Sequence, residues 1–353
     1  MLNLSHRHRK LQLFIVSLAI SITTLLFILF FTPYKITPET IDALAKINPF
    51  YLSVAIGMHI AAWIIWSFRL KLMSDFVSAR AEIKKRKHLK LSKALKIILS
   101  SYFAASITPS QFGGEPVRIY LLSKNGLTVG DSTVVVFGER ALDLVVVIVG
   151  AAISFMLFRA VLSENIILYA IFTFIGACLC VGVAIMAYGI AKPEKAKKII
   201  DLLLSKILRY RRLEKLKDRA YQELDNFYNA LKKFQNEGKN TLRLALIFTL
   251  AFWLAEFLVP SFILLGFGAN PVWIPSIAAQ FILTIVVAIP TTPGSSGVAE
   301  LSLAYLYSTL VAAPLLGVFV VTWRLTMYYM NLIVGSVISV KILGESRTQP
   351  KTL

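Results

Sequence analysis

The chain has 353 residues, of which 57% are hydrophobic and only 16% are charged, and this balance excludes an ordinary soluble globular protein. Its 38 Lys and Arg residues against 19 Asp and Glu residues give a formal net charge of +19. Because the basic residues flank long apolar runs, the charge indicates contact with an anionic membrane surface and no nucleic-acid partner. The sequence therefore predicts an integral membrane protein.

The apolar runs are long enough to be transmembrane helices, and they lack the alternating pattern of barrel strands. About 20 apolar residues cross roughly 30 Å of hydrocarbon as a helix. The first run follows a basic start but has no convincing cleavage site, so it is interpreted as a retained span rather than a signal peptide. The six runs interpreted as full spans are Leu11–Phe31, Phe50–Trp66, Val129–Phe158, Ile166–Ile190, Leu242–Phe267 and Leu315–Val340.

The basic residues predict the orientation of these spans. Segments 69–96 and 192–240 hold ten and fourteen Lys and Arg residues, and each end of the chain holds three more, whereas the loop 32–50 holds two. The positive-inside rule then places both termini of a multi-pass cell-membrane protein in the cytoplasm. The count of crossings works only if 97–123 and 272–312 enter the bilayer and leave on the side that they came from.

Both of these stretches are interrupted by Pro and Gly, in TPSQFGGEPVR (108–118) and in IPTTPGSSGVAE (289–300). A shift of 184 residues aligns the two interruptions, although Glu115 and Glu300 miss each other by one residue. Three crossings per half is an odd number, so the halves must face opposite ways, which is typical of transporters with a central site. The polar residues that coincide are Thr108 and Thr292, Pro109 and Pro293, Gly113 and Gly297, and Arg140 and Arg324.

The predicted fold is an all-α polytopic membrane protein with six full spans and two re-entrant broken-helix hairpins, arranged as two inverted repeats. Unwound backbone is tolerated at membrane depth only beside protein or a water-filled cavity. The alternative is a pair of ordinary Pro-kinked helices or extracellular turns. The predicted divisions are a first repeat over 1–160 with hairpin 97–123, a second over 161–345 with the basic insertion 192–240 and hairpin 272–312, and a cytoplasmic tail over 346–353.

Charged residues also lie inside apolar runs, where each costs about 3 kcal/mol on insertion scales. Glu139, Arg140 and Asp143 fall in VVVFGERALDLVVVIVG, and Arg324 falls in VFVVTWRLTMYYM. In one interpretation the first three neutralise one another on a single helix face. In the other, Arg140 and Arg324 approach a common centre and bind an anion, for which the planar guanidinium suits phosphate.

The remaining polar features allow bland interpretations beside functional ones. Glu256 could pair with either arginine or carry a proton, and His59 is interpreted as packing or interfacial rather than as a titrating switch. Cys178 and Cys180 are interpreted as inert apolar residues. The segment 192–240 predicts a cytoplasmic helical pair near the headgroups, serving as a solvated linker or as a site for anionic lipid.

With TPSQFGGEPVR, GERALDL and TTPGSSGVAE in view, the sequence resembles the flippase-like membrane domain of lysylphosphatidylglycerol synthases and their stand-alone archaeal and bacterial relatives. The resemblance covers nearly the whole chain and implies translocation of a lipid between leaflets. Because the chain ends at Leu353, directly after the last span, the soluble aminoacyl-transferase domain of the bifunctional synthases is expected to be absent. The family-type motif positions are Gly113, Gly114, Glu115, Pro116, Gly138, Glu139 and Arg140.

The favoured function is a flippase or scramblase for an anionic phospholipid, a glycolipid or a polyprenyl-phosphate-linked lipid. The alternatives are a secondary transporter of a soluble anion and a membrane-embedded lipid-modifying transferase. The sequence shows no phosphate-binding glycine loop, metal-spaced His/Asp set or serine elbow, so we expect no catalytic residues, metal or cofactor. The expected substrate-binding residues are Thr108, Pro109, Gly113, Gly114, Glu115, Arg118, Glu139, Arg140, Asp143, Glu256, Thr292, Pro293, Gly297, Glu300 and Arg324.

Overall fold

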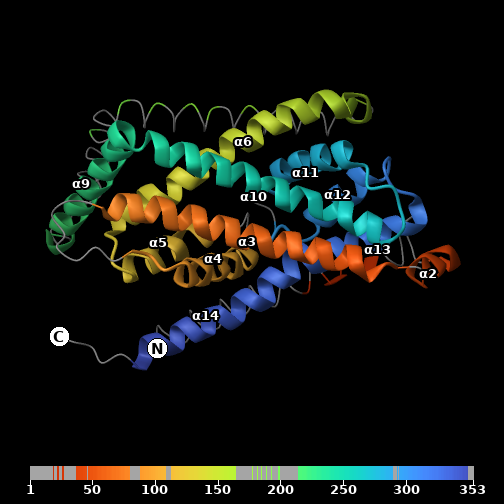
Figure 1. Cartoon of the computed structure of the whole chain (residues 1–353), viewed down its shortest axis with the longest axis horizontal. Helices are drawn as coiled ribbons and strands as arrows, with labels where there is room; N and C mark the ends of the chain where they lie inside the picture. The colour runs from red at the N-terminus through yellow and green to blue at the C-terminus, as the bar shows by residue number, and fades with distance from the viewer. Residues whose placement is uncertain are drawn as a thin grey trace.

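The structure is a computed structural model of the chain, and it describes residues 37–45, 47–79, 88–108, 113–163, 214–288, 292 and 294–348, with isolated positions in 19–27 and 177–198. The predicted spans Leu11–Phe31 and Ile166–Ile190, and the insertion up to residue 213, lie almost wholly outside the described residues. The described part is helical and contains no strand (Figure 1). Its helices are α2 (Pro38–Ala45), α3 (Pro49–Ser78), α4 (Leu91–Ser106), α5 (Gly114–Lys124), α6 (Val129–Ser163), α9 (Glu214–Glu237), α10 (Lys239–Gly266), α11 (Trp273–Val287), α12 (Val298–Tyr307), α13 (Ala313–Arg324), the π-helical turn η2 (Leu325–Tyr329) and α14 (Met330–Thr348).

Three of the described helices are long and apolar enough to cross a membrane, namely Pro49–Ser78, Lys239–Gly266 and Ala313–Ile342. Helix α3 begins where Asn48 accepts a hydrogen bond from the Phe50 N–H at 3.0 Å, with Pro49 at its first position. It continues twelve residues past Trp66, where the predicted span ended. The third of these helices contains the π turn η2, which hydropathy did not predict.

The prediction that both Pro/Gly stretches interrupt a helix is confirmed. Helices α4 and α5 are separated by residues 107–113, and α11 and α12 by residues 288–297. Each pair folds back on itself: a Cβ on Gly114 would lie 3.2 Å from the carbonyl oxygen of Ser101, and the Tyr307 hydroxyl lies 2.7 Å from that of Ser276. The two interruptions therefore produce two helical hairpins.

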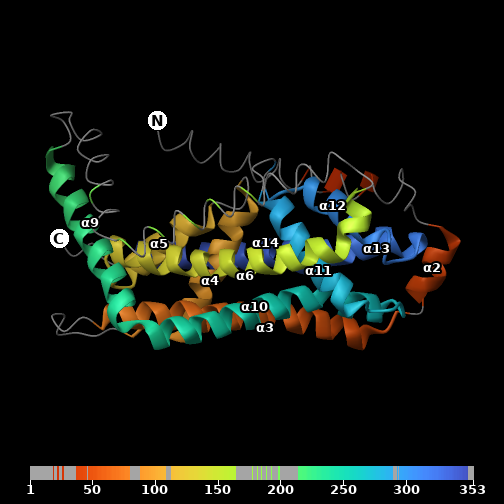
Figure 2. The same cartoon turned by 90° about the horizontal axis from the view of Figure 1, so that it is seen from above.

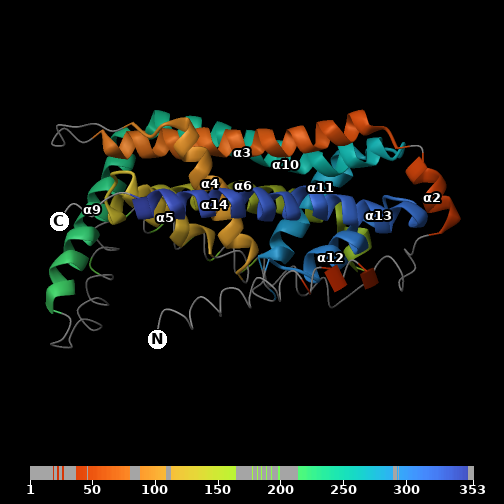
Figure 3. The same ribbon diagram turned by 90° about the horizontal axis from the view of Figure 1, so that it is seen from below.

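The 184-residue shift found in the sequence also relates the helix bounds. Shifted by this amount, α5 falls on 298–308 and α6 on 313–347, which are the positions of α12 and of the run from α13 to α14. The packing follows the same relation, because α4 packs on α14 and α11 packs on α6. Figures 2 and 3 show α3 and α10 lying side by side along one side of the molecule.

Helices α3 and α10, which occupy corresponding places in the two halves, run antiparallel. The Asn48 N–H donates to the Gly266 carbonyl at 2.8 Å at one end, and the rings of Phe68 and Phe248 stack toward the other. Packing between helices in a bilayer depends on van der Waals contact rather than on exclusion of water. Antiparallel packing of corresponding helices is the arrangement that an inverted repeat requires.

Helices α2 and α9 lie at opposite ends of the bundle (Figure 1). At one end, α2 is held by the Thr40 hydroxyl, which donates to the Pro314 carbonyl at 2.7 Å. At the other end, α9 accepts a hydrogen bond from the Gly130 N–H through Glu223 and donates one from Lys233 to the Phe76 carbonyl, each at 2.7 Å. One side of α9 is apolar, and its residues Leu224, Phe227, Leu231 and Phe234 are buried or partly buried.

Candidate functional site

The two helical hairpins meet at their turns. The backbone N–H of Gly294 donates a hydrogen bond to the carbonyl oxygen of Thr108 at 3.1 Å. The Tyr328 hydroxyl, from η2, donates to the carbonyl oxygen of Ser106 at 3.1 Å. The segments that the sequence aligned across 184 residues are therefore in direct contact, although Pro109 and Pro293 themselves lie outside the described residues.

Corresponding threonines brace the two turns. The Thr108 hydroxyl donates to the Ala104 carbonyl at 2.9 Å and accepts from the Gly113 N–H at 2.8 Å. The Thr292 hydroxyl donates to the Ser296 carbonyl at 2.6 Å. Each threonine thus joins the two ends of its own turn, which is a positioning role and leaves it little freedom to bind a ligand directly.

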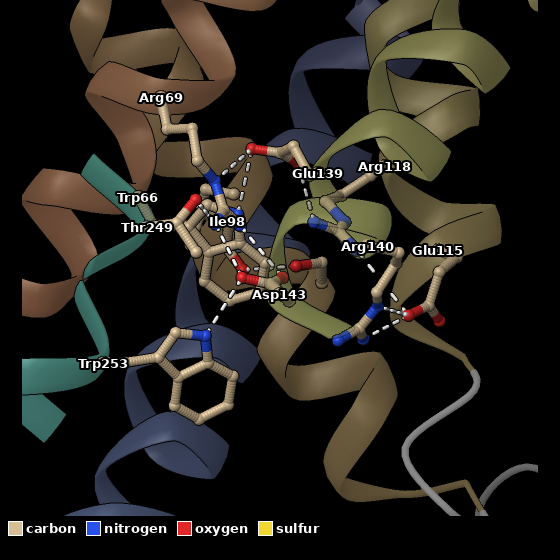
Figure 4. Close-up of polar contacts among 11 residues, drawn as sticks. Trp66, Arg69, Ile98, Glu115, Arg118, Glu139, Arg140, Asp143, Thr249 and Trp253 are labelled. Carbon is tan, nitrogen blue, oxygen red and sulfur yellow. Dashed lines mark hydrogen bonds and ion pairs between the residues drawn. The ribbon is translucent and has the colours of Figure 1, made fainter. Parts of the chain in front are cut away.

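A buried cluster of charged side chains lies next to the turn between α4 and α5, with Glu139 of α6 at its centre (Figure 4). The Glu139 carboxylate accepts from Arg69 Nε at 3.2 Å, from Arg118 Nη1 at 2.9 Å and from the Trp66 indole N–H at 3.2 Å. Its side chain is fully buried, and those of Arg69 and Arg118 are 0% and 1% exposed. One carboxylate therefore joins helices α3, α5 and α6.

Asp143, one helical turn further along α6, completes the inner part of the cluster (Figure 4). It accepts from both terminal nitrogens of Arg69, at 2.6 and 3.1 Å, and from the Trp253 indole N–H at 3.2 Å. The Thr249 hydroxyl accepts a further bond from Arg69 at 2.8 Å, so α10 contributes two partners. Such a fork of hydrogen bonds fixes the direction of the guanidinium as well as its position.

Arg140 has a different partner from the one that helix spacing suggested. It forms an ion pair with Glu115, at the start of α5, rather than with Asp143 on its own helix. The Glu115 carboxylate also lies 3.6 Å from Arg118. The Arg140 side chain is 38% exposed, so it is the accessible guanidinium of this group. We name Arg69, Arg118, Arg140, Glu115, Glu139 and Asp143 the first cluster.

The first cluster is formally neutral, since three arginines face three carboxylates. A buried charge is tolerated when a partner of opposite sign compensates it. Removing one partner of a buried pair leaves the other charge uncompensated and costs about 3–5 kcal/mol. Counting Arg69 with the basic loop 69–96 was wrong, because α3 continues through this residue and buries it completely. The orientation that the loop predicts is unaffected, as nine basic residues remain in it.

The turn between α11 and α12 has its own ion pair nearby, between Arg324 of α13 and Glu300 of α12, at 2.8 Å. Glu300 also accepts from the Gly297 N–H at 2.7 Å and so caps its own helix. Arg324 donates to the Gly294 carbonyl at 3.1 Å and to the Ser296 hydroxyl at 3.0 Å, and it is buried. We name Glu300, Arg324, Ser296 and Tyr328, whose ring lies 3.8 Å from the guanidinium carbon, the second cluster.

The ion pairs Glu115–Arg140 and Glu300–Arg324 correspond to each other. In each, a carboxylate in the first turn of the outgoing half-helix binds an arginine about 24 residues later in the following helix. The near match of Glu115 and Glu300 in the sequence therefore reflects a shared role. Since each arginine has its own carboxylate, neither depends on an anion between them for compensation, as one interpretation of the sequence had required.

Glu256 pairs with His59 and with neither arginine of the repeat. His59 Nδ1 lies 3.1 Å from both carboxylate oxygens of Glu256, between α3 and α10. The two side chains are 1% and 6% exposed, so His59 is packed inside the protein. Within the described ranges, no group of three or more His, Cys, Asp or Glu residues is placed to hold a metal ion.

Sequence reasoning missed several partners of these charges, chiefly Arg69, Trp66, Thr249, Trp253 and Tyr328. A signal for the first two was present, because His59, Trp63, Trp66 and Arg69 recur at helical spacing and share one side of α3. The contributions of Thr249 and Trp253 had no comparable signal, because they follow from the packing of α10 on α3 and α6.

Comparison with known proteins identifies the family of the chain. The family model described as the lysylphosphatidylglycerol synthase TM region matches residues 14–335. A UPF0104 membrane protein of Archaeoglobus fulgidus is 32% identical over 91% of this chain and 94% of its own length. UPF0104 membrane proteins of Methanocaldococcus jannaschii and Methanothermobacter thermautotrophicus are each 26% identical, over 92% and 78% of this chain and 94% and 80% of their own. The chain is thus an integral membrane protein that belongs to the lysylphosphatidylglycerol synthase TM region family.

Proposed function

We propose that this protein moves a lipid with a phosphate-bearing headgroup between the leaflets of the cell membrane, as a flippase or scramblase. In the proposed topology, six full spans surround two hairpins that enter from opposite sides and meet halfway. Both termini, helix α9 and the basic segments lie in the cytoplasm, where they contact anionic headgroups. The two membrane repeats divide near residue 160.

The observation that carries the proposal is the pair of corresponding Glu–Arg ion pairs beside the contact between Thr108 and Gly294. Opposed hairpins with equivalent polar groups give a cargo similar contacts from either side of the membrane. A headgroup at the meeting point would lie near one Glu–Arg pair from each half, of which Glu115–Arg140 is accessible and Glu300–Arg324 is buried.

The exposed edge of the first cluster suggests the chemistry of the headgroup. Arg140 can offer its planar fork to phosphate oxygens, which neutral lipids lack. Glu115 is 15% exposed beside it and accepts hydrogen bonds only. A headgroup with phosphate and nearby hydroxyl or ammonium donors would therefore meet both partners of the ion pair, while its acyl chains stay in lipid.

Family membership supports a lipid cargo, because the family takes its name from the membrane region of enzymes that make lysylphosphatidylglycerol. The relatives named above carry no activity in their names, so the support extends to the class of molecule only. We propose no synthase activity for this chain, whose described residues form the membrane region.

The test is leaflet exchange in vesicles that contain the purified protein. Fluorescent phosphatidylglycerol is distributed over both leaflets, and a membrane-impermeant reductant bleaches the outer one. With active protein, the inner pool becomes accessible and bleaching approaches completion. Arg140→Gln and Arg324→Gln together should slow exchange about 10- to 100-fold, because hydrogen bonds to charged groups contribute about 1.5–3 kcal/mol.

Matched controls distinguish a headgroup site from general damage. Arg243→Gln removes an exposed arginine of α10, whose partner is the nearby Asn240 side chain, and should leave exchange unchanged. The proposal would be overturned if vesicles with wild-type protein lost no more lipid fluorescence than vesicles without protein. Release of entrapped inorganic phosphate would instead indicate a soluble-anion transporter, and a new lipid product found by mass analysis would indicate a transferase.

A further inference from the structure

The antiparallel pair of helices α3 and α10 carries two polar layers within its apolar length. Arg69 and Thr249 form one layer, inside the first cluster, and His59 and Glu256 form the other. Ten residues of helix separate His59 from Arg69, which is about 15 Å along the axis. The His59–Glu256 layer belongs to neither cluster, and nothing in the proposed path of the headgroup uses it.

We propose that His59 and Glu256 form a proton-binding site that couples lipid translocation to a proton gradient. The inference rests on the proposed function and goes beyond it, because it adds an ion and a source of energy. The site takes up one proton per cycle, shared between imidazole Nδ1 and the carboxylate. An exchange protein without such a site can only equalise the two leaflets.

The charge of the pair explains why uptake of a proton would alter the conformation. With the imidazolium facing the carboxylate, the pair is neutral and fits an apolar helix interface. After loss of a proton, a net negative charge remains at a position that is almost fully buried, and such a charge is strongly disfavoured inside a membrane. The deprotonated pair is therefore stable only when the helices separate and admit water.

The free ring nitrogen gives a second observation that points to a mobile proton. His59 Nε2 is buried and has no hydrogen-bond partner in the described part of the chain, whereas Nδ1 is held by Glu256. A structural histidine normally has both nitrogens satisfied, since buried polar atoms almost always find partners. The unsatisfied Nε2 is the atom through which a proton enters or leaves when water reaches the pair.

The surroundings of the pair contain few other charges. From α4, the Tyr102 ring packs edge-on against Trp66, whose indole N–H donates to Glu139 of the first cluster. The charges of Glu256, Asp143, Arg118 and Arg69 all act on the Tyr102 hydroxyl. In the described part of the chain, no hydrogen bond joins the His59–Glu256 pair to the first cluster.

A second contact connects the pair to the other half of the protein. The Trp63 ring packs edge-on against the His59 imidazole at 5.0 Å, and its indole N–H donates to the Asn331 side chain at 2.8 Å. Asn331 is the second residue of α14, just after the π turn η2, and π turns within long helices often occur at functional sites. Movement of α3 upon deprotonation would therefore displace Asn331 and the helix that carries Arg324 and Tyr328.

The first experiment needs no transport. Infrared difference spectra of the purified protein between acidic and basic pH should contain a carboxylate stretching band, shifted as the facing imidazolium loses its proton, that Glu256→Gln and His59→Gln both remove. The exposed His88→Gln and Glu237→Gln are matched controls, and both should keep the band unchanged. Spectra that lack any band sensitive to Glu256→Gln would overturn the proton site.

The second experiment measures the leaflet ratio of fluorescent phosphatidylglycerol at equilibrium in vesicles with a pH gradient of about one unit. One proton per lipid can shift that ratio up to about tenfold, because one pH unit is equivalent to a factor of ten. The shift should reverse with the gradient, disappear with a protonophore and be absent in Glu256→Gln. An equal ratio in wild-type vesicles under either gradient would overturn the coupling.

The two experiments separate failure of this inference from failure of the proposed function. Wild-type protein that exchanges lipid but ignores the gradient contradicts only the coupling. Wild-type protein that moves no lipid contradicts the proposed function, while the infrared band still decides whether His59 and Glu256 bind a proton. The overturning result of the second experiment is measured on wild-type protein, so it does not depend on how well the variants fold.

Discussion

The amide of Gly294 donates a hydrogen bond to the carbonyl of Thr108, although the two residues lie 186 positions apart in the chain. Both belong to turns that interrupt a helix. Their contact joins the two hairpins through the backbone, so it depends on how closely the chains approach and not on side-chain identity. Gly294 is suited to this place because its φ is +59°.

Replacing Gly294 with alanine should destabilise the protein by about 1–3 kcal/mol, the cost of holding a non-glycine residue in a strained backbone conformation. A Cβ at this position would also lie 2.6 Å from the Ser106 carbonyl oxygen and from the Tyr328 ring. The measurement is thermal unfolding in detergent. Gly57→Ala is the control, because no atom lies within 4 Å of its Cβ and alanine favours helix; equal unfolding of both variants would contradict the prediction.

Replacing Arg69 with methionine should cost about 3–5 kcal/mol, because Glu139 and Asp143 would lose a buried counter-charge. Lys71→Met, two residues along the same helix, removes an ion pair with Asp75 that is partly exposed and should cost less than about 1 kcal/mol. Urea or thermal unfolding of the two variants in the same detergent provides the comparison. Similar losses would show that the first cluster contributes no more than a surface pair.

Replacing the two corresponding arginines should affect the stability of the protein to different extents, although both residues contribute to lipid exchange. Arg324→Gln leaves Glu300 buried without its counter-charge and should cost about 3 kcal/mol or more. Arg140→Gln should cost about 1 kcal/mol or less, because water reaches this side chain. Unfolding of the two single variants measures the difference; a larger loss for Arg140→Gln would contradict the burial that separates them.

Gly335→Ala should weaken the packing of α4 on α14. A Cβ on Gly335 would lie 2.5 Å from the backbone carbonyl oxygen of Leu99, so the helices would have to separate. Small residues permit such close approach between membrane helices. We expect a loss of about 1–3 kcal/mol, typical of overpacking. Gly335→Ala should lower the unfolding temperature in detergent, and an unchanged value would show that the interface adapts freely.

The inverted topology predicts that the turns after α5 and α12 face opposite sides of the membrane. Lys124→Cys and Thr309→Cys place single exposed thiols there, in a background in which Cys178 and Cys180 are alanine. An impermeant maleimide should label Lys124→Cys only from the cytoplasmic side and Thr309→Cys only from outside. Labelling of both from one side would contradict the opposed hairpins.

Some of the architecture was readable from the sequence because it follows from local chemistry. Proline removes a backbone donor and glycine permits turns, so an interruption of the helices near Thr108 and Thr292 could be predicted from these residues. Apolar length set the helices that can cross a membrane, and two polar motifs in one register revealed the repeat. These properties belong to short segments and do not depend on what surrounds them.

The tertiary structure alone decided which charges meet. Glu139, Arg140 and Asp143 share one helix, yet their partners Arg69, Arg118 and Glu115 come from two others. A buried charge is stable only beside a partner with suitable geometry, and that partner is chosen by helix packing rather than by spacing along the chain. His59 and Glu256, 197 residues apart, became a pair for the same reason, because α3 and α10 pack antiparallel and bring the two side chains to the same level.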